Sequence, residues 1–208
     1  KFGARIFMTL NTIIYDDELQ EAYSLMCRAE DAGVDAIIVQ DLAILKMADG
    51  GPDGNGRRIR IPLHASTQCA IRSADKALFY KGLGFSRLVL EREMELPRIR
   101  EISHATGSEI EFFVHGALCV CYSGQCYLSE RITGRSANRG ECIQACRSLY
   151  NLTDASGNVL VKNKALLSLK DYNLLKRIGD LADAGVTSFK IEGRLKNISY
   201  VRNTVLAY

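Results

Sequence analysis

Apolar and polar positions follow a repeated order along the chain: a helix, a glycine and a short apolar strand. Helical periodicity is found at residues 17–32, 73–83 and 171–184. A glycine follows each stretch, namely Gly33, Gly84 and Gly185. The apolar strands predicted after these glycines, at 36–40, 87–90 and 188–191, lead into Asp41, Glu91 and Glu192. Glycine past a helix end is the usual C-cap, and an uninterrupted apolar strand suits a sheet covered on both faces.

Three further strands and one helix complete this order. We predict the strands at residues 4–10, 61–64 and 111–115, and the helix at 95–105. Alternating strands and helices with short connections predict an α/β fold with a parallel sheet. A polar residue ends nearly every strand: Asn11, Asp41, His64, Glu91, His115 and Glu192. Such side chains share one mouth in a barrel, so we expect a partial TIM-type β/α barrel, with about six of the usual eight strands.

The sequence predicts one barrel-type domain over residues 1–208, with a hairpin at 151–162. Because the chain begins almost within a strand and ends within a helical pattern, we expect a fragment of a longer chain. Its composition, 47% hydrophobic and 25% charged with a net charge of +3, is that of a globular protein. No apolar run reaches the roughly 20 residues of a membrane span, and no leader is seen. We therefore expect a cytoplasmic protein without a membrane partner.

Residues 116–150 interrupt the helix–strand order and carry five of the seven cysteines. Clustered thiols in a reducing compartment indicate metal binding or catalysis, and four thiolates can hold zinc or an iron–sulfur cluster. Six residues separate Cys119 from Cys126 and three separate Cys142 from Cys146, which fits zinc knuckles poorly and a larger cluster better. Zinc, or a chance grouping of buried thiols, is the alternative. The other cysteines, Cys27, Cys69 and Cys121, are interpreted as packed side chains, with a ligand or catalytic role as the alternative for Cys121.

The same loop carries side chains that suit a nucleic acid. Its arginines are Arg131, Arg135, Arg139 and Arg147, against two acids. Arginine at this density suits phosphate contacts, while Tyr122 and Tyr127 suit stacking on a displaced base. A solvated basic loop with packed tyrosines is the alternative interpretation.

Several runs of residues resemble one known family. They are Thr9-Leu10-Asn11-Thr12, Val39-Gln40-Asp41, Leu63-His64-Ala65-Ser66-Thr67-Gln68, Leu90-Glu91-Arg92-Glu93, His115-Gly116-Ala117-Leu118-Cys119, Gly124-x-Cys126-x-Leu128-Ser129 and Phe189-Lys190-Ile191-Glu192-Gly193-Arg194. Together they are similar to the collagenase-like peptidases of family U32, over essentially the whole chain. The family is named for collagen degradation, without a settled catalytic type. Other members are linked to oxygen-independent hydroxylation of transfer RNA, ribosomal RNA and the ubiquinone ring.

The resemblance implies a 4Fe-4S cluster on Cys119, Cys126, Cys142 and Cys146, where the RNA-acting members have cysteines. It also implies hydroxylation of an RNA base, with prephenate as a candidate oxygen source. The runs at 134–140 and 167–171 look closest to the ribosomal RNA branch. The expected partners are therefore RNA and a small carboxylate such as prephenate.

The residues at the expected mouth supply candidate chemistry. The candidate catalytic residues are Asp41, His64, Glu91, His115 and Glu192, because carboxylates serve in acid–base catalysis and histidines carry protons near neutral pH. The candidate substrate-binding residues are Asn11, Gln68, Tyr122, Arg135, Arg139, Lys190 and Arg194. Lys190 and Arg194 either hold a carboxylate substrate or pair with Glu192. For each acid, capping the next helix is the alternative role.

A peptidase acting on collagen-like peptides is the alternative function. Only His64, His104 and His115 are available as bases, and no nucleophile-elbow or H-E-x-x-H pattern is present. A third class is a zinc-stabilised binding module without catalysis. The residues favour hydroxylation over both.

Overall fold

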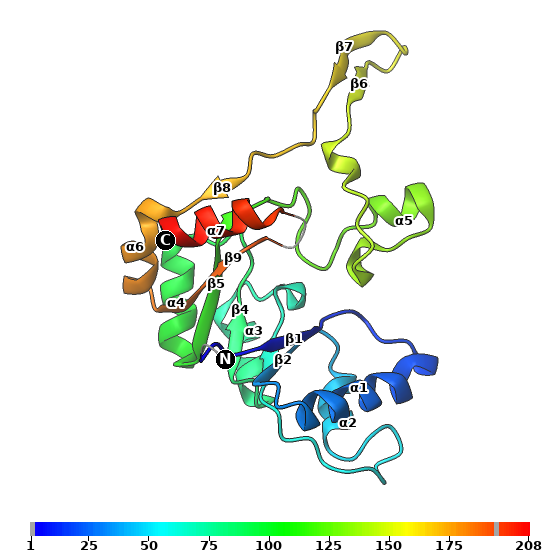
Figure 1. Cartoon of the computed structure of the whole chain (residues 1–208). Helices are drawn as coiled ribbons and strands as arrows, with labels where there is room; N and C mark the ends of the chain where they lie inside the picture. The colour runs from blue at the N-terminus through cyan, green and yellow to red at the C-terminus, as the bar shows by residue number, and fades with distance from the viewer. Residues whose placement is uncertain (1–2, 194–195) are drawn as a thin grey trace.

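The computed structural model describes residues 3–193 and 196–208 and contains a seven-stranded sheet with helices packed along it (Figure 1). Six strands are parallel and follow chain order: β1 (Phe7–Leu10), β2 (Ala36–Val39), β3 (Leu63–Ala65), β4 (Arg87–Val89), β5 (Glu109–Gly116) and β9 (Val186–Ile191). The two-residue β8 (Tyr172–Asn173) pairs antiparallel with the end of β5. The predicted α/β fold with a parallel sheet is confirmed.

Five helices connect these strands and cover one face of the sheet. They are α1 (Leu19–Asp31), α2 (Ala43–Ala48), α3 (Ala74–Gly82), α4 (Leu96–Thr106) and α6 (Ile178–Asp183). Their ends follow ordinary capping chemistry. The Ser73 hydroxyl accepts a hydrogen bond from the Lys76 N–H at 3.3 Å where α3 begins, and Gly107 ends α4 with a φ of 58°.

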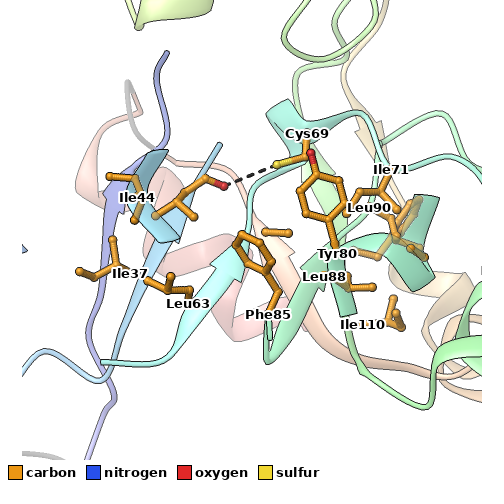
Figure 2. Packing of buried hydrophobic residues seen from close by; sticks show 14 of the residues in the cluster. Ile37, Ile44, Leu63, Cys69, Ile71, Tyr80, Phe85, Leu88, Leu90 and Ile110 are labelled. Atoms are coloured by element: carbon orange, nitrogen blue, oxygen red, sulfur yellow. Dashed lines mark hydrogen bonds between the residues drawn. The ribbon is translucent and has the colours of Figure 1, made fainter. Parts of the chain in front are cut away.

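The hydrophobic core lies between these helices and alternate residues of the strands. Figure 2 shows Ile37, Leu63, Leu88 and Ile110, from four successive strands, in one layer with side chains of the helical connections. Cys69 is buried in this core, and its Sγ lies 3.6 Å from the Val39 carbonyl oxygen. Its interpretation as a packed side chain is confirmed.

The opposite face of the sheet carries a buried network of charges. The Arg87 guanidinium donates to Glu109 at 2.8 Å and to Glu111 at 2.9 Å. Lys190 donates to the other Glu111 oxygen at 2.6 Å, and Ser188 donates to Glu111 at 3.0 Å. Burial acts to raise the pKa of Glu111, but Lys190, Arg87 and Ser188 outweigh it and hold that pKa below its usual range. One carboxylate thus joins β4, β5 and β9.

The sheet curves toward this charged face. Arg87 of β4 lies 5.0 Å from the ring centre of Phe7 on β1, although β2 and β3 separate the two strands. On a flat sheet three strand spacings of about 4.8 Å would separate them. Chain-order parallel strands that curve in this way resemble the wall of a β/α barrel. Closure stays a prediction, because no pairing joins β1 to β9 within the described residues.

Several predicted boundaries differ from the structure, and β5 and β9 each begin two residues earlier than predicted. The helix predicted at 171–184 is wrong at its start, because Tyr172 and Asn173 form β8 and α6 begins at Ile178. The Tyr172 hydroxyl donates to the Phe113 carbonyl and holds this segment on β5. α2, which begins two residues after Asp41, was not predicted. Strands β1 and β3 begin later than predicted, so that His64 lies in the middle of β3.

The remaining elements lie outside this helix–strand order. The predicted hairpin is present as β6 (Tyr150–Thr153) and β7 (Val159–Lys164), and it extends away from the sheet (Figure 1). The insertion 116–150 is mostly irregular, with a short α5 (Leu128–Thr133). α7 (Ile198–Ala207) forms the last helix. Five 3-10 turns are present as well, at Asp16–Glu18, Thr67–Cys69, Ala137–Arg139, Ala145–Arg147 and Leu175–Arg177. No helix in the described part of the chain combines the length and the apolar character that a membrane span requires.

We expect Glu111→Gln to lower the free energy of unfolding by about 3–5 kcal/mol, because the change removes the buried carboxylate that is shared by the buried Arg87 and the partly exposed Lys190. Urea denaturation at pH 7 measures this value. Glu109→Gln is the matched control, since it removes the other Arg87 partner, whose side chain is 53% exposed. We expect that control to cost under about 1 kcal/mol.

The dependence on pH gives a second check on the same carboxylate. A lowered pKa in the folded state stabilises the protein above the unfolded pKa of about 4.3, and this contribution is lost as the pH falls through the folded value. Glu111→Gln should therefore reduce the steepness of acid unfolding. Equal losses of stability in the two glutamine variants would contradict the proposed role of Glu111.

Candidate functional site

A cavity of about 160 Å³ lies between the segments that follow β3 and β4 and the loop 116–150. Four of the five loop cysteines line it: Cys119, Cys126, Cys142 and Cys146. The fifth, Cys121, does not line the cavity. The structure therefore brings together the four thiols that were predicted as metal ligands and leaves out the one that was interpreted as a neighbour.

These thiols surround a space and do not converge on one point. Among residues 3–193 and 196–208, no three His, Cys, Asp or Glu side chains are grouped closely enough to ligate a single metal ion. Burial raises the pKa of Cys119. Burial, with the neighbouring Cys126, raises the pKa of Cys121 to about 11. A space lined by four sulfurs fits a group of several metal atoms better than one zinc ion, which needs all its ligands within about 2.3 Å.

Close backbone contacts hold the loop in place around the cavity. Gly124 has a φ of +73°, and a Cβ at this position would lie 2.4 Å from the Gln68 carbonyl oxygen. The Asn138 side chain accepts a hydrogen bond from the Cys126 N–H at 3.0 Å. The buried Ser129 hydroxyl accepts one from the Ile143 N–H at 3.2 Å. Each contact fixes a segment that carries a cysteine or lies next to one.

Two arginines connect the loop to other parts of the chain. Arg139 donates to the Ile13 carbonyl and to Glu18, and its guanidinium lies 4.1 Å from the ring centre of Tyr15. Arg147 donates to the Leu118 carbonyl at 3.0 Å and to Ser168 at 2.9 Å. Arg139 was predicted to bind substrate, but the structure places it in contacts within the protein.

Two of the predicted catalytic acids are paired with arginines. Glu91 is 2% exposed and accepts two hydrogen bonds from the Arg72 guanidinium, one of them at 3.0 Å. Glu192 lies 2.7 Å from Arg92, at an angle outside hydrogen-bonding geometry, so this contact is an ion pair. Arg92 also lines the cysteine cavity and donates to the Ala117 carbonyl at 3.2 Å. Both acids therefore position cations beside the cavity.

Asp41 and His64 lie in settings that suit structural roles. The Asp41 carboxylate accepts hydrogen bonds from the Ile14 and Ala43 N–H groups, both at 2.9 Å, so both of its oxygens are engaged. His64 is 5% exposed and its ring meets the edge of Phe7 at 4.9 Å. Burial and the nearby Arg87 lower the pKa of His64 to about 4. The ring is neutral at pH 7, which does not suit a proton carrier near neutrality.

His115 is held between two tyrosines of the C-terminal segment. Its Nε2 lies 2.9 Å from the Tyr200 hydroxyl, and its Nδ1 lies 3.4 Å from the Tyr208 hydroxyl. His115 precedes Gly116, where the chain turns toward the cysteine loop. Of the predicted histidines, it is the one with hydroxyl groups at both ring nitrogens.

The other predicted binding residues are spread over several settings. Lys190 pairs with Glu111 and not with Glu192, so the predicted ion pair between Lys190 and Glu192 is wrong. Arg194 lies outside the described residues. Asn11 Nδ2 lies 3.5 Å from the Ser66 hydroxyl. Gln68 lines the cavity, as does Tyr122, and Arg135 pairs with Glu141 at 3.3 Å on the surface.

Two site residues escaped the sequence analysis. Arg72 and Arg92 lie in the segments after β3 and β4, and each pairs with an acid that was singled out. The signal for Arg92 was its place next to Glu91 in the matched run 90–93. Arg72 had no such signal, since its partner lies 19 positions away in the chain.

A serine or cysteine peptidase requires a nucleophile that is hydrogen bonded to a base. Within the described residues, no serine or cysteine side chain is hydrogen bonded to a histidine. The ring nitrogens of His115 face tyrosine hydroxyl groups instead. The arrangement that would activate a serine or cysteine nucleophile is thus not formed in this part of the chain.

Comparisons with known proteins agree with the family resemblance. The family model of Peptidase family U32 matches residues 1–208. The 23S rRNA 5-hydroxycytidine C2501 synthase of Escherichia coli (strain K12) is 54% identical over 100% of this chain and 30% of its own length. The tRNA hydroxylation protein P1 of Bacillus subtilis (strain 168) is 36% identical over 100% of this chain and 49% of its length. A collagenase of Porphyromonas gingivalis (strain ATCC BAA-308 / W83) is 35% identical over 99% and 51%.

The chain spans between 30% and 51% of the length of these three relatives. Among solved structures, the U32 peptidase Mk0906 is similar with a TM-score of 0.50 and 12% identity, over 94% of this chain and 72% of that chain. At this identity the likeness concerns the fold alone.

We expect Gly124→Ala to displace the segment between Cys119 and Cys126, because the added methyl group would meet the Gln68 carbonyl. Hydrogen exchange of the amides in residues 119–126 should increase, and the free energy of unfolding should fall by several kcal/mol. Gly134→Ala is the matched control, since Gly134 has a φ of +74° with open space around it. It should cost only the left-handed backbone strain of about 1 kcal/mol. Equal effects of both changes would contradict the close contact at Gly124.

Proposed function

The chain belongs to peptidase family U32, and from this premise we propose that it takes part in hydroxylating an RNA base without molecular oxygen. The proposal includes a 4Fe-4S cluster held by Cys119, Cys126, Cys142 and Cys146. The observation that carries it is the single cavity lined by these four thiols. The relatives named for 23S rRNA 5-hydroxycytidine synthesis and for tRNA hydroxylation support the RNA substrate.

The donor chemistry of the cavity lining suits the proposed cluster. Its lining includes the apolar side chains of Val120, Leu128, Ala137 and Ala145 beside the four sulfurs. Thiolate ligands with apolar surroundings are the setting in which proteins bind iron–sulfur clusters and tune their potential. A bound cluster would supply single-electron transfer at this place. Zinc is the alternative metal.

We propose ribosomal RNA over transfer RNA as the substrate. The identity of 54% to the 23S rRNA enzyme exceeds the 36% to the tRNA hydroxylation protein P1. Hydroxylation replaces one C–H bond of the base by C–OH, which is a two-electron oxidation. A small carboxylate such as prephenate is the proposed oxygen source, and in this proposal it also accepts the two electrons as its own C–O bond is broken.

The chain's own residues would prepare this reaction. Arg92 lines the cavity and is held by Glu192, so it places a positive charge beside bound RNA or a bound carboxylate. His115, with a tyrosine hydroxyl at each ring nitrogen, can pass a proton along hydrogen bonds to Tyr200 or Tyr208. Glu91 and Glu192 act on their arginines in this proposal and not as proton donors.

We expect the protein purified without oxygen to contain roughly four irons and four acid-labile sulfides per chain. Cys142→Ala and Cys146→Ala should lose both. Cys121→Ala, which removes the thiol outside the cavity, should keep them. One zinc ion without sulfide would contradict the cluster, and loss of iron in the Cys121 variant would contradict the assignment of ligands.

The reaction itself is tested on unmodified RNA. We expect the reduced protein, supplied with prephenate, to add one oxygen atom to a base of a 23S ribosomal RNA fragment in the absence of oxygen gas. Mass spectrometry of the RNA nucleosides measures the product. The Cys146→Ala variant should form none. Cleavage of gelatin by the metal-free protein, with no RNA product, would favour the peptidase alternative.

A further inference from the structure

We propose that Tyr122 is a stacking platform for one unpaired RNA base, and that Arg72 and Glu91 position it. This inference rests on the proposed RNA function and assigns a place to the base. Tyr122 lies in the short loop between Cys119 and Cys126 and lines the cysteine cavity. A base stacked on its ring would therefore lie next to that cavity.

One face of the Tyr122 ring is already covered. The Arg72 guanidinium carbon lies 3.4 Å from the ring centre, which is direct contact of a planar cation with an aromatic face. Tyr122 is nevertheless 56% exposed, so its other face is open to solvent. An exposed aromatic face beside basic residues is the usual means by which proteins hold single-stranded nucleic acids.

Glu91 fixes Arg72 and, through it, the ring. The carboxylate is buried and accepts from two nitrogens of the guanidinium, so the plane of Arg72 is set by a two-point contact. The positive charge of Arg72 is paired with Glu91. Arg72 and Glu91 are thus positioning residues, and Tyr122 is the contact residue.

The backbone beneath the ring is fixed as well. Gly124 lies against the Gln68 carbonyl, and the Ser123 hydroxyl lies 3.4 Å from that of Thr67. Tyr127 on the same loop is similarly exposed, at 65%, but no cation contacts its ring among the described residues. Tyr127 is therefore the matched comparison for the ring that Arg72 covers.

The test uses a single-stranded RNA oligonucleotide that carries one 2-aminopurine, whose fluorescence is quenched when the base stacks. We expect wild-type protein and Tyr122→Phe to bind it and to quench it. Tyr122→Ala should weaken binding by about 5- to 150-fold and lose the quench, as expected for one stacked base. Tyr127→Ala should behave as wild type. Unchanged binding and quenching in Tyr122→Ala would overturn the platform while leaving RNA binding intact.

The dependence of RNA affinity on salt distinguishes a positioning role of Arg72 from a phosphate contact, because only loss of a phosphate contact changes that dependence. In the pair variant Arg72→Gln with Glu91→Gln, neither charge is left buried alone. We expect weaker quenching, a two- to fivefold loss of affinity of the order of one exposed cation–π contact, and an unchanged dependence of affinity on salt. If the slope of log affinity against log salt concentration becomes shallower by the amount expected for about one phosphate contact, Arg72 binds phosphate. That result would overturn its assigned role. Wild-type protein that hydroxylates RNA without quenching the probe would overturn the platform and leave the proposed function standing.

Discussion

The buried carboxylate of Glu111 is the contact on which the arrangement of the sheet depends. Arg87 and Lys190 point to the same face from β4 and β9, and both pair with Glu111 of β5, which is buried as Arg87 is. This shared partner links the three strands across the charged face. The segments that follow these strands therefore begin at defined places, and they include Glu91, Ala117 and Glu192.

The same kind of contact, a carboxylate paired with a cation, also occurs at the carboxyl ends of the strands. Glu91 holds Arg72 and Glu192 holds Arg92, so each acid directs a cation toward the cysteine cavity. Both acids thus pair with arginines beside the cavity, and Glu91 uses both of its oxygens in doing so. In the proposed reaction, proton transfer would fall to His115, whose two ring nitrogens face tyrosine hydroxyl groups.

Much of this arrangement could be predicted from the sequence, because it follows from local pattern. Helix periodicity and the glycines after it located α1 and α3, periodicity alone located α4, and the family resemblance marked the four cysteines that line one cavity. Contacts between distant positions could not be predicted in this way. The pairing of Lys190 with Glu111, the bond from Tyr172 that replaces a helical turn by β8, and the stacking of Arg72 on Tyr122 all depend on the folded chain.

The attachment of the cysteine loop has a consequence for how a metal group would be acquired. Arg139 connects the loop to the Ile13 carbonyl, Arg147 connects it to Ser168, and Gly124 lies against the Gln68 carbonyl. The conformational entropy of bringing the four thiols together is therefore lost when the chain folds, and not when metal binds. Unlike a zinc finger, which is unfolded without its ion, a chain that held the proposed cluster in this way would stay folded after oxidative loss of the metal and would need only a new supply of iron and sulfide.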